Sequence, residues 1–195
     1  MEGKHVVVIA GPSGSGESTV TNEIIRRFPM RMTRLVTATT RQPRAGEKHS
    51  VDYYFFTKEQ FEEEKNKGHI PEFTYIKNRD TYYGSYLPDL NEKLEKGSIV
   101  IVNPDIVGAK FYKERFNATT IFIVPENVDI LERRVRERNP ELSEEEIEKR
   151  KENARIEIEQ ERPFYDYIVT NTDGKLDKTV TDIIAILMKE GYNLE

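Results

Sequence analysis

The chain of 195 residues contains no cysteine, has only three histidines, and carries no excess of positive charge. Without cysteine it has neither a disulfide framework nor a thiolate metal site. The histidines, at positions 5, 49 and 69, form no pattern, so we assign them no role. A net charge of −5 argues against a protein that binds nucleic acid polymers, although it permits a local basic pocket for a small anion.

Long hydrophobic runs are also absent. No stretch approaches the roughly 20 apolar residues that span a bilayer, and the first residues do not form the apolar segment of a signal peptide. We therefore expect a cytoplasmic protein without a membrane partner. Its size suits one compact core with room for insertions.

The apolar residues gather in four short runs, which predict strands buried on both faces, as in a parallel sheet. Helical patterns alternate with these runs, and the alternation predicts right-handed crossovers and a doubly wound α/β core. The predicted strands are 5–10, 98–102, 119–124 and 167–170, and the predicted helices are 18–28, 106–116, 128–138 and 178–190.

Two regions interrupt the alternation. Residues 33–91 contain arginines, tyrosines and short mixed segments, which indicate an inserted subdomain with β structure. Residues 134–162 are almost entirely charged, and SEEE at 143–146 has the spacing of a capping box that starts a long helix ending before Pro163. This charged segment is typical either of a mobile lid or of a solvated surface helix.

The stretch IAGPSGSGEST, residues 9–19, has the spacing of a phosphate-binding loop except that Glu17 stands where the pattern has lysine. A glycine-rich turn between a strand and a helix directs backbone N–H groups at a phosphate, and the helix N-terminus adds partial positive charge. Neither effect needs the lysine, so we predict a phosphate cradle. Its residues are Ser13, Gly14, Ser15, Gly16, Glu17, Ser18 and Thr19, and the Ser18 hydroxyl would contact Mg²⁺.

Two further stretches resemble the guanylate kinase family. Residues 37–55, TATTRQPRAGEKHSVDYYF, are similar to its GMP-binding motif, and YYGS at 82–85 to its second substrate motif. Together with the loop, the resemblance covers nearly the whole chain and implies a single domain with a P-loop NTPase-type α/β core. It divides the chain into a core of 1–32, 92–133 and 163–195, a GMP-binding subdomain of 33–91 and a helical lid of 134–162.

The resemblance also implies roles for individual residues in GMP binding. Arg41, Arg44, Tyr53 and Tyr83 would hold the GMP phosphate, which agrees with the bidentate donors of guanidinium groups. Glu72 would accept hydrogen bonds from guanine N1–H and the 2-amino group, a pattern that adenine lacks. The remaining matches in the GMP site are Thr37, Ser85 and Asp105. Asp105 matches the second of two acids in the usual pattern, and Asn103 stands where that pattern has the first.

On the ATP side, Arg134, Arg138 and Arg150 match lid arginines, and Asn171 matches the position that reads adenine. The implied reaction transfers the γ-phosphoryl group of ATP to GMP, giving ADP and GDP. Arg41, Arg138 and Arg150 would neutralise charge during transfer, and Mg²⁺ would accompany ATP.

Glu17 places an acid beside a polyanion, so we expect weak use of ATP and near-intact GMP binding. The alternative is a catalytically inactive guanylate-kinase-like module that binds GMP or phosphopeptides. The missing lysine favours that alternative, whereas the lid arginines, Ser18 and Asn171 argue against it. The sequence leaves open whether the protein is a monomer or a homodimer.

Overall fold

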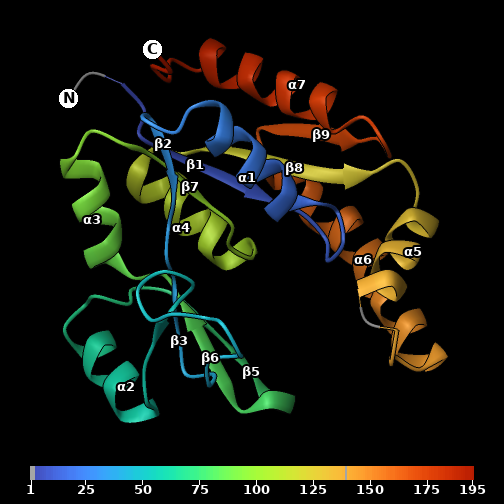
Figure 1. The fold of residues 1–195 in the computed structure, drawn as a ribbon, viewed down its shortest axis with the longest axis horizontal. Coiled ribbons are helices and arrows are strands. Elements are labelled where there is room, and N and C mark those ends of the chain that lie inside the picture. The colour runs from blue at the N-terminus through green and yellow to red at the C-terminus, as the bar shows by residue number, and fades with distance from the viewer. Residues whose placement is uncertain (1–2, 139) are drawn as a thin grey trace.

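The computed structural model describes residues 3–138 and 140–195, and of Arg138 only its place at the end of a helix. Five parallel strands form the central sheet in the order β2-β7-β1-β8-β9 (Figure 1). Their bounds are Met32–Arg34 for β2, Ile99–Val102 for β7, Val6–Ala10 for β1, Thr119–Pro125 for β8 and Tyr167–Asn171 for β9. The expected α/β core with a parallel sheet is thereby confirmed.

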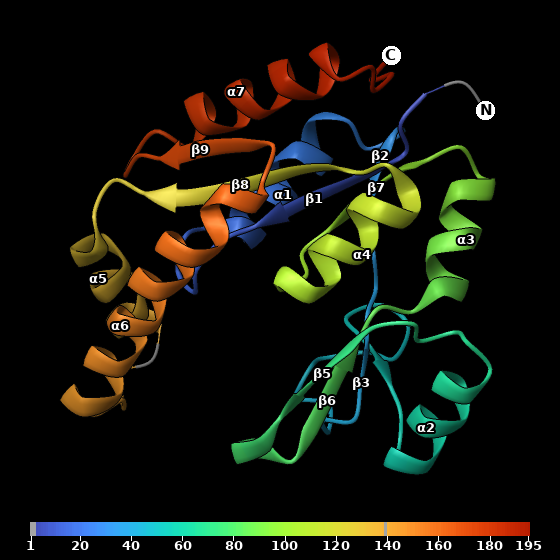
Figure 2. The ribbon, with the colours of Figure 1, turned by 180° about the vertical axis from the view of Figure 1, so that it is seen from behind.

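Helices cover both faces of this sheet because its strands are apolar on both sides. One face packs against α1 (Glu17–Arg27) and α7 (Leu176–Lys189), through buried residues such as Val7, Ile24 and Ile183. The other face packs against α3 (Leu87–Glu95) and α4 (Ile106–Phe116), with Val8 and Leu90 buried between them. Figure 2 shows α3 and α4 on the side opposite α7.

Strand β2 was not expected. It pairs with β7 in parallel register, with Met32 opposite Ile99 and Arg34 opposite Ile101. The predicted boundary at residue 33 therefore falls inside a strand of the central sheet. The three residues Met-Thr-Arg have no apolar run of their own, so only the packing against β7 makes them a strand.

The inserted region forms a second, smaller sheet below the first (Figure 1). Its four strands run in the order β4-β3-β6-β5, with β3 parallel to β4 and antiparallel to β6. The bounds are Ala38–Thr39 for β3, Tyr54–Phe55 for β4, Phe73–Ile76 for β5 and Thr81–Gly84 for β6, and α2 (Lys58–Asn66) packs beside them. The predicted β structure in this region is confirmed.

The charged segment forms two helices, α5 (Val128–Arg138) and α6 (Glu144–Glu161), followed by a 3₁₀ turn at Arg162–Phe164. Ser143 caps α6 in a capping box with Glu146, as the spacing predicted. Arg136 pairs with Glu132 at 2.8 Å and with Glu144, and Lys151 pairs with Glu132 at 2.8 Å. These ion pairs join the two helices to each other.

Both views place α5 and α6 beside the carboxyl ends of the central strands and apart from the small sheet (Figures 1 and 2). No helix in the described part of the chain combines the length and the apolar character needed to cross a lipid bilayer.

Candidate active site

The glycine-rich loop follows β1 and ends at the first turn of α1. Gly14 and Gly16 have φ angles of 94° and 100°, in the left-handed region that favours glycine. Gly16 is the N-cap of α1 and offers no side chain, so the amides of the first turn are left to a ligand. A Cβ at Gly11 would lie 2.3 Å from the carbonyl oxygen of Ile123, so the loop approaches β8 as closely as backbone permits.

Two predicted ATP residues lie against this loop. The Asn171 side chain donates to the Ser15 carbonyl at 2.7 Å and accepts from the Thr179 hydroxyl at 3.2 Å. Arg134 donates from Nη1 to the carbonyls of Gly14 and Ser15, both at 3.2 Å. The structure thus brings Arg134 and Asn171 together at the loop, where both support its backbone. They line a pocket of about 530 Å³ that also includes Gly14, Gly16 and Thr19.

A second pocket, of about 420 Å³, opens on the other side of the loop, and we call it the acidic pocket. Four carboxylates line it and no lysine or arginine is among its described lining residues, which are Ala10, Gly11, Ser13, Gly14, Gly16, Glu17, Ser18, Thr19, Asn103, Pro104, Asp105, Glu157, Glu161 and Tyr165. Burial raises the pKa of Glu157, and the nearby Glu161 raises it further. The pocket is therefore strongly electronegative where phosphates would enter.

The acidic pocket also tests whether the chain fits a magnesium ion. Ser18 presents an exposed hydroxyl at the start of α1, and its neighbours in the pocket are oxygen donors, which suit Mg²⁺. Within residues 3–138 and 140–195, no group of three acidic or histidine side chains converges to hold a metal by itself. This donor set fits an ion carried mainly by phosphates and water, with Ser18 as its protein ligand.

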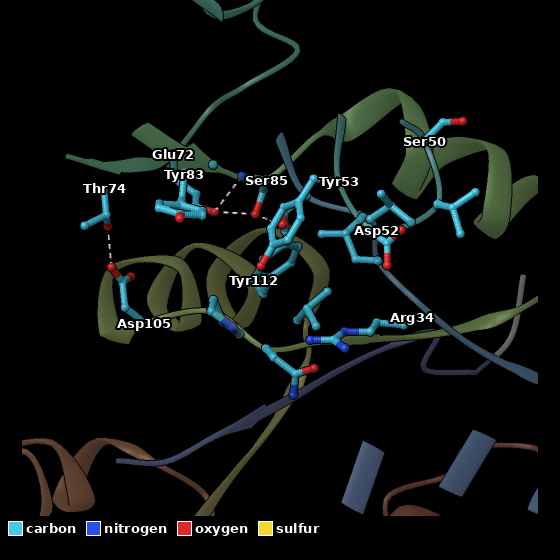
Figure 3. Close-up of a pocket in the computed structure, with 18 of the residues that line it drawn as sticks. Arg34, Ser50, Asp52, Tyr53, Glu72, Thr74, Tyr83, Ser85, Asp105 and Tyr112 are labelled. Atoms are coloured by element: carbon cyan, nitrogen blue, oxygen red, sulfur yellow. Dashed lines mark hydrogen bonds between the residues drawn. The ribbon is translucent and has the colours of Figure 1, made fainter. Parts of the chain in front are cut away.

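A third and larger cavity, of about 1050 Å³, lies between the central sheet and the small sheet, and we call it the large cleft (Figure 3). All predicted GMP residues line it except Arg41 and Arg44; those that do are Thr37, Tyr53, Glu72, Tyr83, Ser85 and Asp105. Arg34, Asn103 and Tyr112 line it too, without having been predicted as site residues. Figure 3 shows the side chain of Arg34 extending along the lower side of the cleft.

Glu72 lies at one end of the large cleft, where Ser85 holds it. The Ser85 hydroxyl donates to Oε1 of Glu72, and the Ser85 backbone N–H donates to the same oxygen at 3.2 Å. Oε2 lies over Gly108, where an added Cβ would be 3.1 Å away. Burial raises the pKa of Glu72, the bonds from Ser85 lower it, and the charge of Asp105 raises it. The carboxylate is fixed in place with Oε2 facing away from Ser85.

Asp105 and Asn103 follow β7 and serve local structure in this state. Asp105 is the N-cap of α4, with Oδ1 accepting from the amides of Val107 at 3.0 Å and Gly108 at 3.1 Å. Its other oxygen accepts from the Thr74 hydroxyl (Figure 3). The Asn103 side-chain amide donates a hydrogen bond to the Ile9 carbonyl at 2.8 Å. An ionised aspartate or glutamate at this position would have no proton to donate.

The predicted phosphate-binding arginine Arg41 is already paired. Its Nη1 and Nη2 donate to the two carboxylate oxygens of Glu47, each at 2.9 Å, and Nη1 also donates to the Gln42 carbonyl at 2.8 Å. The hydrogen bond from Arg41 lowers the pKa of Glu47. The Arg41 guanidinium also lies 5.3 Å from the ring centre of Tyr53. Arg44 is exposed, and its backbone N–H donates to Glu47 at 2.7 Å.

Glu47 was not predicted as a site residue, although it lies within the motif of residues 37–55 and lines the large cleft. The sequence offered no signal that would have paired Glu47 with Arg41. Arg150, on α6, is partly exposed and lines none of the three cavities. The Arg138 side chain lies outside the described part of the structure, so its predicted catalytic role stays a prediction.

The fold and cavities together define a nucleotide-binding α/β protein with a phosphate loop at the carboxyl edge of a parallel sheet. Comparison with known families is more specific. The family model described as guanylate kinase matches residues 3–190, so this chain belongs to the guanylate kinase family.

Individual relatives agree with the family assignment. The chain is similar to the guanylate kinase of Prochlorococcus marinus, with 38% identity over 185 residues that cover 94% of this chain and 97% of that one. It is 34% identical to the guanylate kinase of Fusobacterium nucleatum over 181 residues, 92% of this chain and 94% of the other. Among solved structures, it is similar to guanylate kinase from Anaplasma phagocytophilum, with a TM-score of 0.72, 26% identity, and coverage of 99% and 89%.

Proposed function

We propose that this protein transfers the γ-phosphoryl group of ATP to GMP, giving ADP and GDP. One observation carries the proposal beyond family membership: the large cleft and the acidic pocket share a wall. Asn103, Pro104 and Asp105 line both cavities. A nucleotide in the cleft and phosphates on the loop would therefore meet at this wall, as a direct transfer between two bound substrates requires.

In the acceptor half, the Glu72 carboxylate would bind the guanine edge, because an ionised carboxylate accepts from both N1–H and the 2-amino group. Thr37 and Ser85 stand beside it in the same cleft. In the same cleft, Tyr53 and Tyr83 lie with ring centres 6.0 Å apart, and the Arg41 guanidinium lies 5.3 Å from the ring centre of Tyr53. This arrangement supports a phosphate site of two phenols and the guanidinium groups of Arg41 and Arg44.

On the ATP side, the loop amides and the start of α1 would hold the ATP phosphates. Arg134 and Asn171 support the loop through hydrogen bonds to its backbone carbonyls. Mg²⁺, bound through Ser18 and the phosphates, would neutralise the charge that spreads over the transferring group. Arg138 and Arg150 would add positive charge when α5 and α6 move towards the cleft. No covalent intermediate on the protein is needed.

Glu17 reduces this activity in our proposal. It replaces a positive charge with a negative one in a pocket that already holds three other carboxylates. We therefore expect weak use of ATP, while the cleft that binds GMP keeps its residues. The alternative, an inactive binding module for GMP or phosphopeptides, is favoured by Glu17, and it differs from the proposal in having no turnover.

The test combines turnover with direct binding. Purified protein with MgATP and GMP is assayed for ADP release, and GMP binding is measured separately by calorimetry. Glu72→Gln replaces one acceptor with an amide donor that faces guanine N–H groups, so GMP affinity falls by roughly 30- to 150-fold, the cost of a lost charged hydrogen bond. The matched variant Glu62→Gln, on the exposed side of α2, leaves GMP affinity unchanged.

The outcomes distinguish the functions. GMP-dependent ADP release, even slow, with Glu72-dependent GMP binding supports the kinase. GMP binding without turnover, in this protein and in its Glu17→Lys variant, supports the binding module instead. If GMP does not bind at all, the kinase and the GMP-binding form of the module are both wrong.

A further inference from the structure

Tyr112 carries a phenol into the interior of the protein. It lies on α4, its side chain has no exposed surface, and it belongs to the apolar cluster that includes Val102 and Ala109. Its hydroxyl donates to Oγ of Ser85 at 2.5 Å. Ser85 in turn donates to Glu72, so the three side chains form one chain of hydrogen bonds that ends at the guanine-facing carboxylate (Figure 3).

The direction of donation along these hydrogen bonds, from Tyr112 to Ser85 to Glu72, follows from the chemistry of the three groups. An ionised carboxylate only accepts, so the single proton of the Ser85 hydroxyl must point at Glu72. Ser85 is then left with lone pairs, which accept the proton of Tyr112. Burial raises the pKa of Tyr112, and the charge of Glu72 adds to the increase, so the phenol keeps its proton. Tyr112 is therefore always the donor.

We propose that Tyr112 is a positioning residue for guanine recognition, which holds the Ser85 hydroxyl in the orientation that donates to Glu72. The inference rests on the proposed function, in which Glu72 binds the base. Without the phenol, Ser85 gains freedom to rotate and to use its proton elsewhere. With the phenol, Oε1 is occupied by Ser85 and Oε2 is presented in one direction.

The hydrogen bonds that link Tyr112, Ser85 and Glu72 also affect the protonation of Glu72. Asp105, at the start of α4, is the titratable group that raises the pKa of Glu72, and Glu72 in turn raises the pKa of Tyr112. Hydrogen bonds in a chain strengthen one another, so loss of the phenol weakens the bond from Ser85 that stabilises the charged carboxylate. The already raised pKa of Glu72 then rises further. A protonated Glu72 presents a donor to the donors of guanine, and GMP binds less well.

Tyr112→Phe tests the proposal because it removes only the hydroxyl and keeps the ring. We expect GMP affinity, measured by calorimetry near pH 7, to fall about five- to tenfold, as for one lost buried hydrogen bond. GMP binds the ionised form of Glu72, so affinity falls as pH decreases through its pKa. In the variant this acid limb moves to higher pH, by roughly 0.5 unit.

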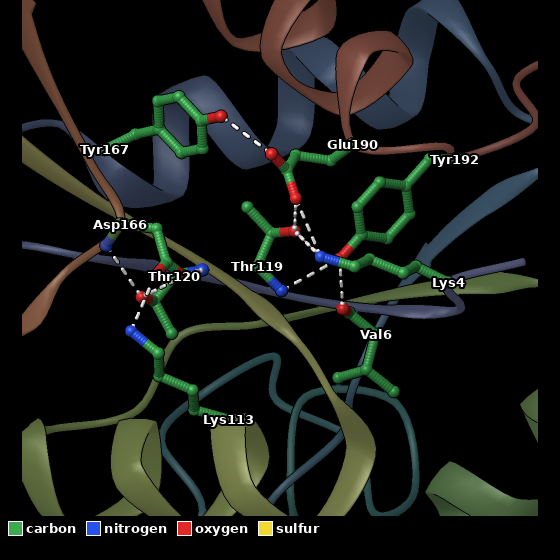
Figure 4. A network of polar contacts seen from close by, with 9 residues as sticks. All are labelled: Lys4, Val6, Lys113, Thr119, Thr120, Asp166, Tyr167, Glu190 and Tyr192. Atoms are coloured by element: carbon green, nitrogen blue, oxygen red, sulfur yellow. Dashed lines mark hydrogen bonds and ion pairs between the residues drawn. The ribbon is translucent and has the colours of Figure 1, made fainter.

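Tyr192 provides the matched control. Its hydroxyl is also buried and hydrogen-bonded, donating to the Val6 carbonyl at 2.5 Å and accepting from the Thr119 N–H at 3.0 Å (Figure 4). Tyr192→Phe removes an equivalent group far from the large cleft. It lowers thermal stability by an amount similar to Tyr112→Phe and leaves GMP affinity and its pH profile unchanged.

Three outcomes are informative. A selective loss of GMP affinity in Tyr112→Phe, with the acid limb displaced, supports the proposal. GMP affinity and a pH profile equal to those of the unaltered protein overturn it, while Glu72→Gln still reports on the proposed function. If the unaltered protein binds no GMP, the proposed function fails and this inference fails with it.

Discussion

Restoring a lysine at position 17 is the most direct perturbation of the phosphate loop. Glu17 is the first residue of α1, follows the glycine that caps this helix, and lines the acidic pocket with Glu157 and Glu161. Glu17→Lys changes the charge by two units beside the ATP phosphates. One unit at about 4 Å with an effective dielectric constant of about 20 corresponds to roughly 4 kcal/mol.

We expect only part of this change, because the side chain of glutamate is shorter than that of lysine and reaches less far towards the phosphates, so the gain is nearer that of one added contact, about 3–4 kcal/mol. At about 1.4 kcal/mol per decade this raises kcat/KM for ATP by two to three orders of magnitude. The new ammonium group also meets two carboxylates whose pKa values are raised by burial, so it relieves their repulsion as well.

The assay follows ADP release at saturating GMP over a range of MgATP concentrations. Glu17→Gln, which removes the negative charge without adding a positive one, gives only a small part of the gain. Glu114→Lys, an exposed site on α4, makes the same change in net charge away from the loop and has no effect. A gain below tenfold in Glu17→Lys, with GMP binding intact, would refute the electrostatic reasoning.

Three further predictions concern other parts of the site. Glu47→Gln weakens the pair that orients Arg41, and we expect KM for GMP to rise several-fold with little change in kcat, measured by steady-state kinetics. Gly108→Ala places a methyl group 2.6 Å from Cβ of Pro104 and 3.1 Å from Oε2 of Glu72, and we expect calorimetry to show at least tenfold weaker GMP binding. Glu157→Gln removes a carboxyl whose pKa is raised in the folded state, so it raises the melting temperature by about 2–4 °C at pH 7. This benefit fades as pH falls through the raised pKa of Glu157 and is gone by about pH 4. Glu159→Gln, exposed on the same helix, leaves the melting temperature unchanged.

The strongest sequence signals were those that depend on neighbours along the chain. The four apolar runs became strands within one residue of their predicted ends, because burial on both faces demands continuous apolar residues. The helix beginning at Glu144 was predicted from its capping box, which is a contact between residues three positions apart. Local chemistry was sufficient in both cases.

Signals that depend on distant residues were missed. Strand β2 is too short and polar to be recognised, and exists because it pairs with β7. Tyr112 resembled any other aromatic residue of an amphipathic helix, since its importance comes from a hydroxyl directed at Ser85, 27 positions earlier. Glu47 was overlooked because an acid within a basic motif gives no indication of its partner.

By itself, the sequence determined the class of the core, the position of the glycine-rich loop and the resemblance to the guanylate kinase family, which the family model confirms. These follow from spacing, periodicity and the chemistry of side chains. Only the tertiary structure decided that Arg41 is held by Glu47, that Asn171 and Arg134 support the loop, and that three other carboxylates gather around Glu17. The physical reason is that hydrogen bonds and charges act over a few ångströms, and folding alone determines which distant residues come that close.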